Sequence, residues 1–454
     1  MIRTDHPEYL NELQLVSDLF YGTDAPMIVH SLKREGNALF SCISVENQTF
    51  NESGTLPACD ALTEKRLVKR FYKLALYHAL KTVTGRRPAW GALTGVRPVK
   101  LAYMVRESGG DPLDFLANTM DVTEEKAGMI GRILRAQEGI YERKDDNYNL
   151  YISLPFCPTK CVYCSFISAE IGKCTQFIEP YIAALEKEIS AVKRFFPKLR
   201  SVYIGGGTPV ALPNDALCRV LDAVGNVKAE YTVEAGRPDC ITRENLQILK
   251  DHGVTRVCVN PQSFSDRTLA AIGRKHTGQD AVDKYYLVKE YGFDVNMDFI
   301  AGLPEETLSG FLENMDKVCE LSPENVTVHT LCLKSGSTLK EQTDRLSEGD
   351  VSRMVSGAYE RLSAAGYEPY YLYRQKYMAA NQENTGYAQK GKVCVYNVDN
   401  MEDTSPVIAC GANAVSKRVF NAENRVERYG SPKDFVTYLN KADQIIREKD
   451  EFFR

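Results

Sequence analysis

The chain has 454 residues, of which 44% are hydrophobic and 26% charged, a balance typical of a soluble globular protein with two or three domains. Its 56 Lys and Arg against 60 Asp and Glu give a formal net charge of -4, which argues against a nucleic-acid partner recognised mainly through its phosphates. The N-terminus (MIRTDHPEYLNELQ) lacks the apolar stretch of a secretory signal, and no run of about eighteen apolar residues occurs, so we expect no transmembrane segment and a cytoplasmic location.

The first part of the chain differs in pattern from the middle. Residues 27–45 (MIVHSLKREGNALFSCISV) predict a mixed α/β start, and an amphipathic helical pattern runs over 62–77. A Pro/Gly-rich connector follows over 86–100, and the polar segment 142–149 (ERKDDNYN) indicates a domain boundary. We therefore expect an N-terminal α/β accessory domain over residues 1–145.

The middle of the chain alternates β-rich runs with amphipathic helical stretches, which predicts parallel strands joined by right-handed crossovers. Six such strands are too few for a complete eight-stranded barrel. We therefore expect an α/β fold with a partial (βα)6 TIM-like barrel over residues 146–340, and chemistry at the C-terminal ends of its strands. The predicted strands are 150–154, 201–206, 231–235, 255–260, 294–302 and 325–331, and the predicted helices are 177–196, 244–253, 280–292 and 309–321.

The alternation stops after about residue 340. A polar helix is predicted over 341–365, and it leads into residues 366–391, which are rich in Tyr, Gln and Asn. We expect a C-terminal, mostly α module over 341–454.

Three cysteines lie close together directly after the first predicted barrel strand. Cys157, Cys161 and Cys164 have the spacing Cys-x3-Cys-x2-Cys, whereas most of the other ten cysteines are scattered in apolar or mixed surroundings. A structural zinc site needs four ligands, so it would have to recruit Cys174 or a histidine. Three thiolates can instead hold three irons of a [4Fe–4S] cluster and leave the fourth iron open. We favour the open cluster over zinc and over three unrelated thiols because further motifs follow in order.

The companion motifs lie at the ends of successive predicted strands. Residues 205–209 (GGGTP) follow the second strand, where glycines let backbone amides approach an anionic or zwitterionic ligand closely. Glu234 ends the third strand, and a carboxylate at that position can accept hydrogen bonds from a ribose. Gln262, Arg274 and Asp298 lie at later strand ends or in the loops after them. Each residue is commonplace alone, but together they predict one site at the barrel mouth.

These motifs carry a family resemblance. The cysteine spacing, with Tyr163 before the last cysteine, resembles the signature of radical S-adenosylmethionine (SAM) enzymes. The strings GGGTP, NPQSF, GRKHT and MDFIAGLPEET resemble the oxygen-independent coproporphyrinogen III oxidase family over residues 150 to about 335, and more weakly beyond. The whole chain, with its long N-terminal extension and its Tyr/Gln/Asn-rich segment, most resembles the coproporphyrinogen dehydrogenase subfamily. The resemblance implies a [4Fe–4S] cluster on Cys157, Cys161 and Cys164, with its fourth iron open for SAM.

The resemblance also implies which residues contact SAM, of which the family binds two molecules. The backbone contact implied for Cys332 rests on position alone, and the turn EAGRPD after Glu234 departs from the best-known members. The residues implied for the cluster-bound SAM are Tyr151, Gly206 and Glu234, and those for the second SAM are Tyr163, Gly207, Thr208, Gln262, Arg274 and Asp298.

The activity implied is anaerobic oxidative decarboxylation of two propionate side chains of coproporphyrinogen III to vinyl groups, which gives protoporphyrinogen IX in haem biosynthesis. A low-potential donor such as a flavodoxin or ferredoxin would supply electrons. A tetracarboxylate substrate also needs cations, and Arg237 is the most interesting because it lies three residues beyond Glu234. The other candidate cations are Lys275, His276, Lys334, Arg374 and Lys376.

Two further functions compete with the decarboxylase. Relatives that share the cluster motif and the C-terminal segment resemble haem chaperones, and the string CVYNVDN (394–400) stands where such relatives carry an HNxxYW-like motif. The chain has only six dispersed histidines and lacks that motif, which favours the enzyme. A radical SAM enzyme acting on another tetrapyrrole is the remaining alternative, and tRNA modification is disfavoured by the acidic charge balance.

Overall fold

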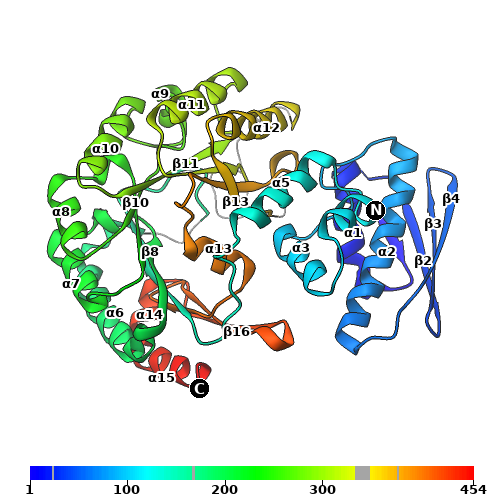
Figure 1. Cartoon of the computed structure of the whole chain (residues 1–454), viewed down its shortest axis with the longest axis horizontal. Helices are drawn as coiled ribbons and strands as arrows, with labels where there is room; N and C mark the ends of the chain where they lie inside the picture. Colours follow the sequence, from blue (N-terminus) through cyan, green and yellow to red (C-terminus); the bar gives the residue numbers. More distant parts are fainter. Residues whose placement is uncertain (23–24, 166–168, 333–347, 376–377) are drawn as a thin grey trace. The chain divides into compact units, whose positions relative to one another are not determined.

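The computed structural model describes residues 1–22, 25–165, 169–332, 348–375 and 378–454 (Figure 1). The chain forms two compact units, Met1–Gly131 and Arg132–Arg454. No helix within the described ranges is both long and apolar enough to cross a membrane.

The first unit is built on a four-stranded sheet with the order β1-β2-β3-β4. In β3, Leu39, Ile43 and Val45 are buried while Phe40 is exposed, so one face of the sheet is covered and the other is open. The long helix of this unit, α2, packs against α1 and the sheet. The bounds are β1 (Ile2–Thr4), α1 (Leu10–Tyr21), β2 (Ile28–Glu35), β3 (Ala38–Val45), β4 (Gln48–Thr55), α2 (Ala61–Thr84), α3 (Pro98–Glu107) and α4 (Pro112–Asp114), and α5 (Glu124–Ala136) runs across the division.

The second unit is built on an eleven-stranded sheet with the order β13-β14-β12-β11-β10-β9-β8-β5-β15-β16-β17. Its central six strands run parallel and in chain order, so their carboxyl ends share one edge. All six strands predicted from the sequence are therefore confirmed, as is the α/β partial barrel. They are β5 (Tyr148–Leu154), β8 (Leu199–Gly206), β9 (Glu230–Gly236), β10 (Arg256–Val259), β11 (Asp294–Ala301) and β12 (Asn325–Thr330).

Crossover helices cover the outer, convex side of this sheet (Figure 1). Leu150 and Ile152 of β5, and Val202 and Ile204 of β8, are fully buried in the same core as the apolar faces of these helices. Alternation along the strands turns Tyr151 and Tyr203 to the opposite, concave side. The helices are α6 (Ile178–Val192), α7 (Asn214–Val224), α8 (Arg243–Asp251), α9 (Asp266–Ala271), α10 (Gly278–Glu290), α11 (Leu308–Leu321) and α12 (Glu348–Ala364).

The C-terminal part is mostly helical, as predicted, but it also adds strands to both edges of the sheet. β14 pairs antiparallel with β12, and β15 pairs parallel with β5. The described strands from β13 onward therefore extend the barrel sheet, and the predicted division at residues 145 and 340 stays a prediction. Residues 341–347 of the helix predicted over 341–365 lie outside the described residues. The elements are β13 (Glu368–Tyr373), β14 (Asn384–Ala388), α13 (Val395–Glu402), β15 (Val407–Cys410), β16 (Val415–Phe420), β17 (Arg425–Gly430), α14 (Phe435–Asn440) and α15 (Ala442–Phe452).

Candidate active site

The cysteine loop begins where β5 ends and is tied to the GGGTP turn. Cys157 belongs to the short strand β6 (Phe156–Cys157), which pairs with β7 (Ala169–Glu170). The Thr208 amide donates to the Phe156 carbonyl oxygen at 2.8 Å, and the Thr208 hydroxyl lies 3.6 Å from the Cys157 Sγ. The Cys164 amide donates to the Cys161 carbonyl at 3.1 Å, so the loop closes on itself.

The three thiols lie on this one loop. Among the described residues, no group of three or more Cys, His, Asp or Glu side chains is placed to hold a single metal ion. A zinc site needs such convergence, whereas each thiolate of a [4Fe–4S] cube binds a different iron. Cys174, the extra zinc ligand considered above, instead directs its Sγ to the Glu170 carbonyl at 3.2 Å. The assignment of Cys157, Cys161 and Cys164 to a cluster stays a prediction.

The three glycines after β8 are required by close packing. A Cβ on Gly207 would lie 2.5 Å from the Phe156 carbonyl oxygen, and one on Gly205 would lie 2.6 Å from the Glu234 carboxylate. Gly206 has φ +96°, and a Cβ there would lie 2.8 Å from the Ser153 hydroxyl. The turn therefore presents backbone and no side chains beside the cysteine loop and Glu234.

Glu234 lies at the end of β9 on the concave side of the sheet. The Tyr203 hydroxyl donates to its Oε1 at 2.5 Å. Burial raises the pKa of Glu234 to about 7, against the lowering effect of the Tyr203 hydrogen bond. The carboxylate is thus held in one orientation and is poised to accept hydrogen bonds near neutral pH.

Asp298 and Gln262 come together through adjacent strand ends. The backbone amide of Gln262 donates to the backbone carbonyl of Asp298 at 3.0 Å, and Gln262 has a left-handed φ of +70°. The Asn296 side chain donates to Asp298 Oδ1 at 2.7 Å, and His329 Nε2 lies 3.9 Å from Oδ2. Burial raises the pKa of Asp298, but the nearby His329 and the hydrogen bond from Asn296 outweigh this effect and hold the pKa below its usual range. Asp298 is therefore ionised.

Tyr163 and Arg274 form a pair across the cysteine loop. Arg274 donates through Nη2 to the Tyr163 hydroxyl at 3.0 Å, while its buried Nε and Nη1 have no hydrogen-bond partner among the described residues. Buried guanidinium nitrogens are normally hydrogen-bonded, so these two donors point to a ligand that supplies acceptors. Cys332 lies further along, where it makes an isolated bridge with Met378.

Most of the described candidate substrate cations are buried rather than exposed for binding a carboxylate. Arg237 is 3% exposed and is engaged by Asp239, and His276 is also buried. Arg374 is buried as well, with Nη2 2.7 Å from the Asn381 Oδ1, whereas Lys275 is exposed. Lys334 and Lys376 fall outside the described residues. Of the described candidates, Arg237, His276 and Arg374 are therefore buried, and both the SAM contacts and the substrate cations stay predictions.

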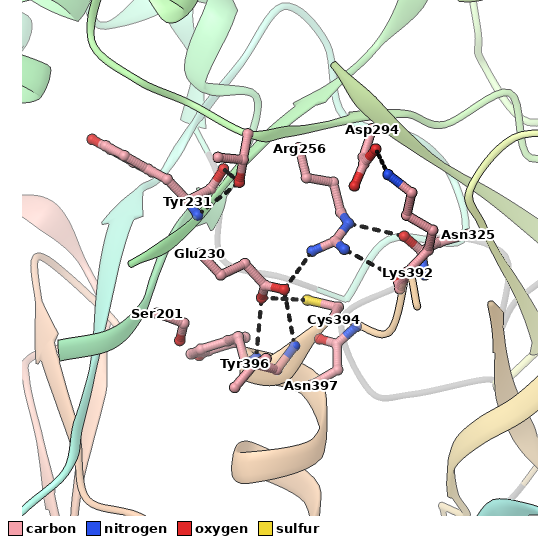
Figure 2. Close-up of polar contacts among 12 residues, drawn as sticks. Ser201, Glu230, Tyr231, Arg256, Asp294, Asn325, Lys392, Cys394, Tyr396 and Asn397 are labelled. Carbon is pink, nitrogen blue, oxygen red and sulfur yellow. Dashed lines mark hydrogen bonds and ion pairs between the residues drawn. The ribbon is translucent and has the colours of Figure 1, made fainter. Parts of the chain in front are cut away.

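Helix α13 occupies the concave side of the sheet, which the sequence did not predict (Figure 1). Tyr396 of α13 stacks on Tyr203 with ring centroids 4.5 Å apart and on Tyr151 at 6.2 Å. The helix start is held by Glu230, which accepts the amides of Val395 at 3.1 Å and Tyr396 at 3.3 Å and is paired with Arg256 at 2.8 Å (Figure 2). The ring stack therefore supports Tyr203, which orients Glu234.

His329 is a second residue that the sequence reasoning missed. It lies on β12 beside Asp298, and the Tyr373 hydroxyl lies 3.5 Å from its Nδ1. The available signal was strand alternation, because Thr327 and His329 point to the same side of β12 and Asp298 pairs with Thr327 in register.

Comparison with known proteins places this site in a family. Residues 151–318 match the model of the Radical SAM superfamily. The oxygen-independent coproporphyrinogen-III oxidase-like protein HemZ of Bacillus subtilis is 32% identical over 463 residues, covering 96% of this chain and 92% of HemZ. The chain belongs to the radical SAM, coproporphyrinogen-III oxidase-like family. Membership implies a [4Fe–4S] cluster and SAM as cofactors, and the unpartnered Arg274 nitrogens and the glycine turn fit such a ligand.

Other relatives of this radical SAM chain carry different names. The heme chaperone HemW of Bacillus subtilis is 34% identical over 193 residues, covering 40% of this chain and 50% of HemW. HemW of Haemophilus influenzae is 27% identical over 315 residues, covering 66% of this chain and 78% of that HemW. The solved coproporphyrinogen III oxidase HemN of Escherichia coli superposes with a TM-score of 0.54 at 20% identity, covering 71% of this chain and 73% of HemN, which supports the fold.

Proposed function

We propose that this chain catalyses the anaerobic oxidative decarboxylation of two propionate side chains of coproporphyrinogen III. The observation that carries the proposal is the set of ligand-ready groups at one strand edge, namely Glu234, Asp298 and the two unpartnered Arg274 nitrogens. The near full-length similarity to a coproporphyrinogen-III oxidase-like protein supports the substrate class. A tetrapyrrole tetracarboxylate is therefore the substrate to test first.

The cofactors would be held by residues of one continuous site. Cys157, Cys161 and Cys164 would bind the [4Fe–4S] cluster, and Tyr151, Gly206 and Glu234 would contact the cluster-bound SAM. When bound, the cluster and SAM supply the 5′-deoxyadenosyl radical of this superfamily. The second SAM would contact Tyr163, Gly207, Thr208, Gln262, Arg274, Asp298 and the Cys332 backbone.

The protein residues orient and shield these ligands. Glu234, held by Tyr203, accepts ribose hydroxyls, and ionised Asp298 attracts a cationic group such as an ammonium or sulfonium. The rings of Tyr151, Tyr203 and Tyr396 close the concave side and exclude water from the reacting atoms. An electron donor of low potential, such as a flavodoxin or ferredoxin, would reduce the site from outside.

A haem chaperone function is the second candidate. Its support is the similarity to several proteins named heme chaperone HemW, which covers up to about two thirds of the chain. The two functions differ in what happens to the tetrapyrrole, because a chaperone binds haem without removing carboxyl groups.

The test is anaerobic reconstitution with iron and sulfide, followed by SAM, a reductant and coproporphyrinogen III. Release of CO2 and formation of protoporphyrinogen support the decarboxylase. Tight haem binding without CO2 release supports the chaperone instead. Cys161→Ala should abolish both cluster assembly and SAM cleavage, and a Cys161→Ala protein that still cleaves SAM would refute the radical mechanism.

A further inference from the structure

Arg237 links the end of β9 to the cysteine loop. It directly follows Gly236, the last residue of β9, and the residue is 3% exposed. Its Nε and Nη2 donate to Asp239 Oδ1 at 2.9 Å and Oδ2 at 2.8 Å, a bidentate pair that fixes the plane of the guanidinium. This burial argues against the earlier expectation that Arg237 binds a substrate carboxylate.

The remaining guanidinium nitrogen points at the loop that carries the cysteines. Arg237 Nη1 donates to the Thr159 hydroxyl at 2.7 Å and lies 4.0 Å from the Cys161 Sγ. Thr159 lies between Cys157 and Cys161 in the sequence, so the Arg237 side chain both donates to the loop and lies near a cysteine sulfur. Only an arginine offers a bidentate face and a further donor in one rigid plane.

We propose that Arg237 is a positioning residue that fixes the Thr159–Cys161 segment and raises the reduction potential of the cluster bound by this loop. The inference rests on the proposed function only in that the cysteine loop holds a [4Fe–4S] cluster. Reduction adds one negative charge to the cluster, and a donor or cation beside a cysteine sulfur favours the more negative state. Asp239 offsets part of the charge, but the guanidinium is the group that reaches the sulfur.

Asp239, which pairs with Arg237, has its own contacts that favour its ionised form. Burial raises its pKa, but the nearby His276 and the two hydrogen bonds from Arg237 outweigh that effect and hold the pKa of Asp239 well below its usual range. His276 Nδ1 lies 3.8 Å from Asp239 Oδ1. The pair therefore stays ionised and keeps Arg237 aimed at the loop.

The experiment is an anaerobic redox titration of the reconstituted full chain, without SAM, followed by electron paramagnetic resonance of the reduced cluster. Arg237→Met should shift the midpoint to a more negative potential and lower the reduced-to-oxidised ratio at a fixed potential by about tenfold, which is about 59 mV for one electron. Arg243→Met is the matched control, because Arg243 is an exposed arginine paired with Glu290 at 2.9 Å. Its midpoint should equal that of the wild type.

Two further variants keep the inference open to refutation if Arg237→Met fails to fold. Thr159→Val removes the hydrogen bond between Arg237 and the loop but leaves the guanidinium in place. It should therefore lower the iron retained per chain while leaving the midpoint potential of the remaining cluster close to that of the wild type. Arg237→Lys keeps the charge without the bidentate geometry and should behave likewise. A full cluster with wild-type potential in Arg237→Met, or wild-type iron content in both other variants, would overturn the inference. If the midpoint potentials of the wild type and Arg237→Met differ as expected but the wild type releases no CO2, the decarboxylase activity is refuted and the role of Arg237 is not.

Discussion

Tyr203 donates its hydroxyl to Glu234 at 2.5 Å, and its ring is stacked 4.5 Å from that of Tyr396. A residue of β8 thus orients a carboxylate at the end of β9 while a helix from the C-terminal part of the chain holds it in place. This geometry couples Glu234 to α13, since movement of the Tyr396 ring would move the Tyr203 hydroxyl that donates to Glu234.

Replacing Tyr203 with Phe should weaken SAM binding about tenfold, because a hydrogen bond to a charged group is worth about 1.5–3 kcal/mol. The ring stack would persist while the pKa of Glu234 rises further, since the Tyr203 hydrogen bond lowers it. Anaerobic calorimetry of SAM binding to the reconstituted protein measures the effect. Tyr231→Phe is the matched control, because the buried Tyr231 hydroxyl has no hydrogen-bond partner in the part of the chain that the structure describes. Equal losses in both variants would contradict the assigned role.

The titration of Glu234 predicts a pH dependence of SAM affinity. Because burial raises its pKa to about 7, the carboxylate is ionised above this pH and protonated below it. The dissociation constant for SAM should therefore fall as pH rises through about 7. Glu234→Gln should bind more weakly and lose this dependence, and a wild-type affinity that is constant from pH 6 to 8 would count against the assignment.

The same carboxyl group should destabilise the folded protein at high pH. The folded state binds a proton more tightly than the unfolded chain, whose usual pKa is 4.5, so stability falls as pH rises from about 4.5 to about 7. At pH 8, Glu234→Gln should be more stable than the wild type by at most about 3 kcal/mol. Melting temperatures of both proteins at pH 5 and pH 8 test this, and the gain should be clearly larger at pH 8 than at pH 5.

The sequence allowed prediction of the central barrel because its signals are local. β8 and β11 are short apolar runs followed by a helical pattern, and consecutive parallel strands bring their polar end residues to one edge. The pairing of Val407 with Asn149 in β15 and β5 joins residues far apart in the chain, so no local pattern predicts it. The position of Tyr396 follows from this pairing and was missed for the same reason.

Arg237 shows the limit of reading a site from chain position. Its place three residues after Glu234 indicates the barrel mouth, but the direction of its side chain depends on Asp239 and Thr159, and Thr159 belongs to another loop. Lys275 is adjacent to the buried His276 yet is itself exposed. Burial and partner choice are tertiary properties, and they separate residues that look equivalent in the sequence.

The GGGTP turn should not tolerate a side chain at Gly207. A Cβ there would lie 2.5 Å from the Phe156 carbonyl and 2.7 Å from that of Leu154, and these backbone atoms cannot rotate away. Gly207→Ala should therefore lower iron content and SAM binding together. Gly172→Ala is the control, because a Cβ on Gly172 meets no atom within 4 Å. Normal iron content in Gly207→Ala would contradict the packing argument.

The buried ion pair of Lys449 and Glu188 should be a main determinant of how the C-terminal helix attaches to the barrel. Lys449 is 1% exposed and contacts Glu188, which also accepts the Tyr438 hydroxyl at 2.6 Å and the Gly411 amide at 2.8 Å. Lys449→Met leaves a buried unpaired carboxylate and should cost about 3–5 kcal/mol of unfolding free energy.

Denaturant unfolding of Lys449→Met, compared with Lys317→Met, tests this attachment. Lys317 pairs with Glu320 at 3.4 Å on the surface, where an ion pair is worth about 0–1 kcal/mol. Adding Glu188→Gln to Lys449→Met should recover part of the loss, because it removes the unpaired charge while keeping acceptor oxygen for Tyr438. If Lys449→Met is no less stable than Lys317→Met, the Lys449–Glu188 pair does not hold α15 on the barrel and the attachment depends on the apolar contacts of α15 alone.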